Sequence, residues 1–167
     1  MATIRGRFSA LLLVAFCAFT SVHARQTVQY SDDEFGPVVR AYLGYLKNEQ
    51  EVVDDRVSRH EVSATYYRRN SNRIRALRQM AIRLARESHN DYLPELEAVS
   101  GTEMNLLFGS DPPQMARLRV GEVLRNTFRF LGVVRAGEAF YLFARLDPYE
   151  QAELTEKAYE IRRPEKK

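Results

Sequence analysis

The sequence contains few of the side chains that most often carry out chemistry in proteins. Among its 167 residues are one cysteine, three histidines and no tryptophan. The cysteine, Cys17, falls in an apolar run near the N-terminus, so the rest of the chain has no disulfide, no thiol nucleophile and no thiolate metal ligand. Asn-x-Ser/Thr glycosylation sites are also absent. The fold must therefore be stabilised by packing rather than by disulfides.

Sequence patterns typical of catalytic and metal sites are missing as well. We find no HExxH, no calcium-loop spacing, no glycine-rich phosphate loop and no serine in a nucleophile-elbow context. His60 and His89 each lie near a carboxylate, but they fall at turns expected at opposite ends of one long helix, about 40 Å apart at its rise per residue. We therefore predict no cofactor and no metal, assign no catalytic residue, and lean against an enzyme.

The N-terminal 24 residues have the pattern of a secretory signal peptide. Arg5 and Arg7 precede an apolar run over residues 10–19, and small residues follow up to Ala24. The run is too short to cross a bilayer as a helix, which takes about 20 residues. We expect cleavage after Ala24 and export to the periplasm or the medium, and the lack of disulfides and glycosylation sites favours a bacterial envelope.

Two alternatives stay open for this N-terminal segment. In a lipoprotein, Cys17 would be acylated and retained, although the bulky Phe16 before it departs from the small residue that such processing needs. In the other alternative, the uncleaved run stays in the membrane as an anchor, although it is short for that role.

Charge is nearly balanced overall but unevenly distributed along the chain. There are 25 basic and 22 acidic residues, and removal of Arg5 and Arg7 with the signal peptide would leave 23 basic ones. A chain so close to neutrality is not broadly attracted to nucleic acid, so we expect no nucleic-acid partner. Residues 32–55 hold seven acids against two bases, whereas residues 56–86 hold nine arginines against Glu61 alone.

Two amphipathic helices are predicted, over residues 32–58 and 63–89. In the first, apolar residues recur at near-heptad spacing, and Pro37 offers an alternative start as the first helical residue. The short connection between the two helices predicts an antiparallel hairpin. In the second helix, the expected apolar seam consists of Tyr67, Asn70, Ile74, Leu77, Ala81 and Leu84.

Beyond residue 91 the pattern changes from helix to strand. Residues 95–99 and 118–124 are predicted as short strands, and residues 127–134 and 139–146 alternate as expected of an antiparallel β-hairpin covered on both faces. Ser100 and Glu103 match a capping box that begins a short helix. Asp147 and Pro148 match the start of a last helix that runs to about residue 161.

These segments together predict an α+β fold. It begins with a long N-terminal antiparallel helical hairpin, which is followed by a small α+β unit with an antiparallel β-hairpin and a C-terminal helix. We expect a signal peptide at residues 1–24, the helical hairpin at 25–91 and the α+β unit at 92–167, packed on the hairpin as one compact domain. A chain of this length can bury a sizeable core.

Two sets of side chains on the helical hairpin are the candidate interaction residues. Tyrosine is favoured at protein interfaces, and guanidinium groups suit phosphate and carboxylate. A plainer interpretation of the same residues is a buried aromatic core and a solvated helix face. A strand edge near residues 117–123 is a third candidate, because it can accept a partner strand. The two sets are the tyrosines Tyr42, Tyr45, Tyr66 and Tyr67, and an arginine stripe of Arg68, Arg75, Arg83 and Arg86.

The leading hypothesis is an exported, non-catalytic envelope or secreted protein that acts as an interaction or scaffold module. It would bind another protein, or a second copy of itself, through the helical hairpin or the sheet edge. The alternative is binding of an anionic envelope polymer or lipid by the arginine stripe. A hydrolase that uses scattered carboxylates is the third hypothesis, because the two members of such a pair can be distant in the sequence.

Overall fold

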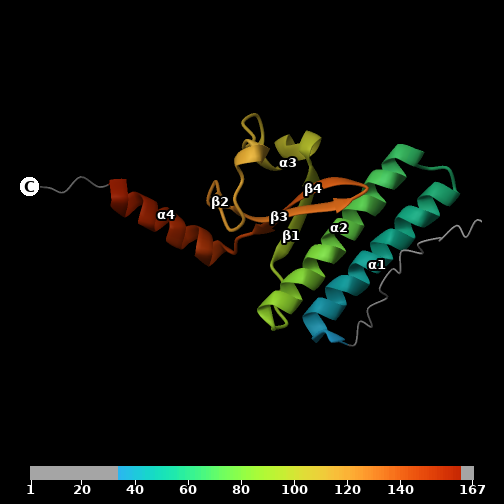
Figure 1. Cartoon of the computed structure of the whole chain (residues 1–167), viewed down its shortest axis with the longest axis horizontal. Coiled ribbons are helices and arrows are strands. Elements are labelled where there is room, and N and C mark those ends of the chain that lie inside the picture. Colours follow the sequence, from blue (N-terminus) through green and yellow to red (C-terminus); the bar gives the residue numbers. More distant parts are fainter. Residues whose placement is uncertain (1–33, 163–167) are drawn as a thin grey trace, which may run out of the picture. The chain divides into compact units, whose positions relative to one another are not determined.

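Two antiparallel helices begin the described part of the chain. The computed structural model describes residues 34–162. The predicted signal peptide at 1–24, with its lipoprotein and membrane-anchor alternatives, therefore lies outside the described residues. Helices α1 (Pro37–Ser58) and α2 (Ala64–Ser88) lie side by side and form the predicted hairpin (Figure 1). Of the two predicted starts for α1, the one at Pro37 is confirmed, because proline fits the first helical turn, where its missing N–H has no intrahelical partner.

The N-terminus of α1 is capped by a side chain that comes from after α2. The two carboxylate oxygens of Asp91 accept hydrogen bonds from the backbone N–H groups of Val38 at 2.8 Å and Val39 at 2.9 Å. Gly36 gives this carboxylate room, since a Cβ there would lie 2.3 Å from the Asp91 Cγ. Asp91 therefore links the C-terminal end of α2 to the N-terminal end of α1, and it places a negative charge at the positive end of the α1 dipole.

Replacing Asp91 with alanine is expected to lower the free energy of unfolding by about 1–2 kcal/mol, the usual cost of losing a helix cap. Two backbone donors of α1 would lose their partner at once. Urea denaturation monitored by circular dichroism measures the change. Asp111→Ala, in an exposed loop, is the matched control, and an equal loss in both variants would contradict the capping role.

A side-chain cap begins α2, and a residue in the left-handed conformation follows each of the two long helices. Ser63 caps α2 by accepting the N–H of Tyr66, and His89 follows α2 with φ of 51°. His60, in the turn after α1, has φ of 60°. The two histidines therefore lie in turns at opposite ends of the hairpin, as predicted.

Four antiparallel strands form one sheet in the order β1-β4-β3-β2. Gly137 joins β3 to β4 with φ of 81°, and a Cβ there would lie 2.5 Å from the Asn72 Nδ2 on α2. This glycine lets the β-hairpin turn tightly against the helix. The strands are β1 (Glu95–Ser100), β2 (Val123–Leu124), β3 (Phe128–Ala136) and β4 (Glu138–Arg145).

The predicted strand over residues 118–124 is largely wrong. Only β2 is extended there, and Met115–Arg117 forms a short 3₁₀ helix, η3. Gly121, with φ of 86°, turns the chain, and its N–H donates to the Phe130 carbonyl at 2.8 Å. The predicted strand edge near residues 117–123 is therefore mostly turn, and the other edge of the sheet is β1.

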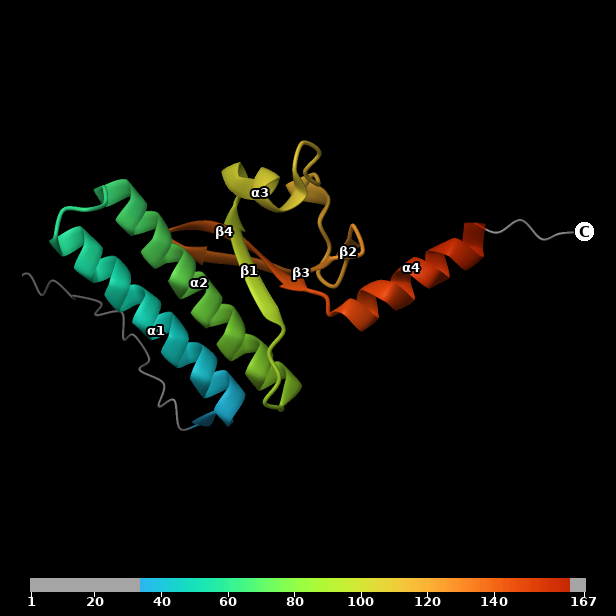
Figure 2. The same cartoon turned by 180° about the vertical axis from the view of Figure 1, so that it is seen from behind.

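Helix α2 lies between α1 and one face of the sheet (Figures 1 and 2). The predicted seam of α2 is partly wrong, since Ala81 is its one fully buried member. A single seam describes packing against one partner helix, whereas α2 has two neighbours and buries small residues in close contact with them. The buried residues of α2 are Ser71, Asn72, Ala76, Met80, Ala81, Ile82 and Ala85.

The opposite face of the sheet is covered by the segment that follows β1. Ser100 and Glu103 form the predicted capping box, which begins the 3₁₀ helix η2 (Gly101–Glu103), and α3 (Met104–Phe108) continues it. The sheet is thus covered on both faces, as predicted. The core under α3 is a cluster of Val99, Met104, Phe108, Phe128, Phe130 and Phe143.

The described chain ends with α4 (Pro148–Arg162). The Asp147 Oδ1 accepts the backbone N–H groups of Tyr149 and Glu150, which confirms the predicted start of this helix. The described residues 34–162 belong to one compact unit. Within residues 34–162, no helix has both the length and the apolar character needed to cross a membrane.

Candidate functional site

A groove of about 600 Å³ lies between α1, α2 and the beginning of β1. Because α2 contacts both α1 and β1, it forms the floor, while α1 and the chain entering β1 form the walls. Val38 and Val52 of α1 are each about half exposed along one wall. The apolar lining consists mainly of Val38, Tyr42, Tyr45, Val52, Ile74, Leu77, Leu93 and Leu96.

Three of the four predicted tyrosines line this groove. Tyr45 is 55% exposed, Tyr66 is also exposed, and the rings of Tyr42 and Tyr45 lie 6.3 Å apart between centroids. Tyr67 is half-buried and does not line the groove. Burial of the Tyr42 hydroxyl, with smaller contributions from Tyr45 and Glu97, raises its pKa to about 12. The groove therefore has an aromatic wall, in which the Tyr42 hydroxyl stays neutral at physiological pH.

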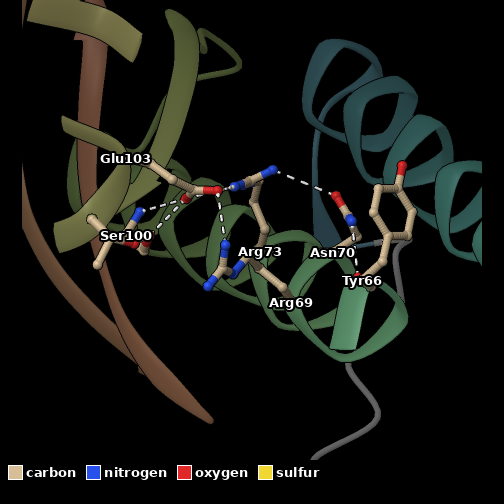
Figure 3. Close-up of polar contacts among 7 residues, drawn as sticks. Tyr66, Arg69, Asn70, Arg73, Ser100 and Glu103 are labelled. Atoms are coloured by element: carbon tan, nitrogen blue, oxygen red, sulfur yellow. Dashed lines mark hydrogen bonds and ion pairs between the residues drawn. The ribbon is translucent and has the colours of Figure 1, made fainter. Parts of the chain in front are cut away.

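A charged cluster that joins α2 to η2 lies at one end of the groove (Figure 3). Arg73 Nη2 donates to both carboxylate oxygens of Glu103 at 2.7 Å, and Arg69 Nη1 lies 3.7 Å from Glu103 Oε1. The N–H of Ser100 donates to Glu103 Oε2 at 3.0 Å, and its hydroxyl does so at 2.8 Å. Asn70 accepts from Arg73 Nη1 at 3.4 Å.

The surroundings of Glu103 keep it ionised far into the acid range. Burial of this side chain, which is 16% exposed, would by itself raise the pKa. The hydrogen bonds from Arg73 and Ser100 and the charge of Arg73 outweigh burial and lower the pKa to about 2. The sequence indicated Glu103 only as a capping residue. Its second role, as the partner of an arginine 30 positions away, depends on tertiary structure.

The predicted arginine stripe does not form one continuous surface. Arg68 and Arg75 line a hollow of about 420 Å³ together with Arg69, beside the β3–β4 turn. Arg86 instead forms an ion pair with Glu34 at 3.1 Å, near the beginning of α1. Arg83 is exposed farther along α2. The four predicted residues therefore contribute to at least two separate environments.

The groove also contains charged side chains, among them Glu49, Glu95 and Arg56. Glu49 is half-buried in the lining and has no ion pair with another residue of the described region. Arg56, at the same end as Tyr66, lies 3.8 Å from Glu61. In residues 34–162, no group of three or more histidine, cysteine or acidic side chains is arranged to hold a metal ion.

Comparison of the chain with protein-family models, with curated proteins and with solved structures finds no match.

Proposed function

We propose that this chain is a non-catalytic interaction module, which binds another protein in the groove between α1, α2 and β1. The observation that carries the proposal is the row of half-exposed apolar and aromatic side chains on α1 that faces this groove. Tyr45 and Val52 are 55% and 52% exposed, although both lie on a concave surface where a partner can bury them. Export, which the sequence of residues 1–24 predicts, is part of the same proposal and would put this binding outside the cytoplasm.

The composition of the groove supports a protein partner rather than a small polar ligand. Its lining joins tyrosines to valines and leucines, and aromatic residues are enriched in the buried centres of protein interfaces. Its charged end is already neutralised, since Arg73 is bound by Glu103. The apolar part therefore supplies most of the area that a partner would cover.

A photo-crosslinking experiment tests this function in cells that naturally produce the protein. Benzoylphenylalanine in place of Tyr45 should give a discrete adduct with another protein, and the adduct should persist at high salt because apolar contacts are not screened. The same amino acid in place of Tyr149, which is 88% exposed on α4, is the matched control and should give none. Equal adducts from both positions, or none from position 45, would refute the groove as a binding site.

Two further variants separate this function from the anionic-ligand alternative. Val52→Arg places a charge in the groove and should abolish the adduct from position 45. Arg68→Glu reverses the charge of the hollow that Arg68 shares with Arg75, and it should leave the adduct unchanged. An adduct lost in Arg68→Glu and at high salt, but kept in Val52→Arg, would favour an acidic partner held by the arginines.

A further inference from the structure

The direction of the backbone groups in β1 follows from hydrogen bonds at the far side of the sheet. The N–H of Phe130 donates to the Glu122 carbonyl at 2.9 Å, and its carbonyl accepts the N–H of Gly121 at 2.8 Å. The Phe130 backbone therefore points away from β4. Because this direction alternates along antiparallel strands, its β4 partner Phe143 points toward β1, where it is paired with Glu97.

The same alternation turns the backbone groups of Leu96 and Ala98 away from β4. Ser100, two residues farther on, agrees with this assignment, because its N–H donates to Glu103 rather than to β4. Among residues 34–162, the structure records no bond outside the ladder from the N–H of Leu96 or Ala98. The free edge of β1 thus carries two unpaired donors and two unpaired acceptors in register.

This edge is shielded from solvent and begins in the groove. Leu96 lines the groove, and Leu96 and Ala98 are only 8% and 6% exposed. Backbone groups that are shielded from water and lack a partner are unfavourable. An incoming backbone would satisfy them, whereas an incoming helix would not, because its own N–H and C=O groups are already paired.

The acidic groups beside this edge are less fully paired than the basic ones. On the face of β1 that points away from α2, Arg145 is the one basic partner of both Glu95 at 3.2 Å and Glu97 at 3.1 Å. On the groove side, the half-buried Glu49 has no ion pair in the described region, whereas the arginines of the lining, Arg56 and Arg73, are paired with Glu61 and Glu103. A partner strand that supplies positive charge would therefore complement this edge.

We propose, resting on the function proposed above, that the occupant is an extended segment of a partner protein in which apolar residues alternate with lysine or arginine. It adds to β1 as an antiparallel fifth strand. Directly opposed residues point their side chains to the same face. The apolar side chains opposite Leu96 and Ala98 therefore enter the groove, and the basic side chains lie opposite Glu95 and Glu97.

A fluorescein-labelled eight-residue peptide of alternating valine and lysine is the probe for this inference. Fluorescence anisotropy with the purified protein should give a Kd below about 1 mM, within the range of measurable weak complexes. Replacing every lysine with glutamate should weaken binding at least tenfold. In the antiparallel arrangement the valine N–H groups face β1, so N-methylation of the valines should also cost at least tenfold, whereas N-methylation of the lysines should change little.

Protein variants and amide signals provide the second readout. Val52→Arg should abolish binding, and Val120→Arg, at an exposed valine in a loop, should not. On addition of the valine–lysine peptide, the amide protons of Leu96 and Ala98 should become protected from hydrogen exchange. Protection that rises with protein concentration and is not displaced by the peptide would assign the edge to a second copy of the chain and overturn the proposal.

The outcomes distinguish this inference from the proposed function. Equal binding of the glutamate peptide, or insensitivity to N-methylation of the valines, would refute strand addition by a basic segment. If the peptide fails to bind while the adduct from position 45 persists, strand addition is wrong and the groove still binds a protein. If both fail, the proposed function is wrong as well.

Discussion

Replacing Phe143 with alanine is expected to lower the free energy of unfolding by about 3–5 kcal/mol, the usual cost of removing a buried aromatic ring. Phe143 has no exposed surface, and its ring lies 5.3 Å between centroids from both Phe108 and Phe130. Its loss would leave a cavity between the sheet and α3. Such a loss is a large share of the stability of a typical domain. Thermal and urea unfolding of the purified variant would measure it.

Two related substitutions make this test specific to the core under α3. Phe143→Leu keeps most of the buried volume and should cost clearly less than the alanine variant. Leu106→Ala removes a large apolar side chain from α3 itself, but Leu106 is 72% exposed, so the change should stay within about 0.5 kcal/mol. A similar cost for Phe143→Ala and Leu106→Ala would show that the aromatic cluster is not the core of this face.

Features that depend on neighbours in the sequence were predictable. The double-sided apolar pattern of residues 127–134 and 139–146 correctly predicted a β-hairpin that is covered on both faces. The start of α4 followed from the capping preference of Asp147 and the fixed φ of Pro148. In each case the physical cause, whether strand alternation or a local hydrogen bond, acts within a few residues.

Features that depend on distant partners were not predictable from one sequence. Asp91 caps α1 from 53 positions away, and its local pattern indicated only a break after α2. The predicted apolar seam of α2 described contact with one helix, so it missed the small residues, such as Ala76 and Ser71, that this helix buries between its two neighbours.

The candidate site shows the same division between local and distant causes. Tyr42 and Tyr45 were named because tyrosines on an amphipathic helix favour interfaces. The second wall of the groove comes from β1, and the strand order that makes β1 an edge is a tertiary property. The predicted edge near residues 117–123 does lie at one edge of the sheet, at β2, but most of that segment is turn and the edge beside the groove was missed.

Replacing Glu103 with glutamine is expected to lower the free energy of unfolding by about 2–3 kcal/mol at pH 7. Losing hydrogen bonds to a charged group costs about this much, after allowance for the partial exposure of the side chain. Glu103 accepts bonds from Arg73 and from both the N–H and the hydroxyl of Ser100. Glutamine keeps the shape of the side chain but removes the charge that compensates Arg73. Glu51→Gln, which disrupts an exposed ion pair on α1, is the matched control and should change stability little.

The pH dependence of this effect has a defined sign. The pKa of Glu103 is about 2 in the folded protein, against an ordinary value of 4.5. Its stabilising contribution is therefore present above pH 4.5 and is lost as the pH falls through 2. The difference in stability between the wild type and Glu103→Gln should shrink steadily between pH 5 and pH 2. A pKa shift of this size can change the free energy of unfolding by about 3 kcal/mol at most over that interval.

Unfolding measured at several pH values, with hydrogen exchange at the Ser100 amide, tests both parts of this prediction. In Glu103→Gln the Ser100 amide should exchange faster, because its charged acceptor is gone. Arg73 also lines the groove, so the same variant should loosen the connection between the floor of the groove and η2. A difference in stability that stays constant from pH 7 to pH 2 would mean that Glu103 contributes through packing and not through its charge.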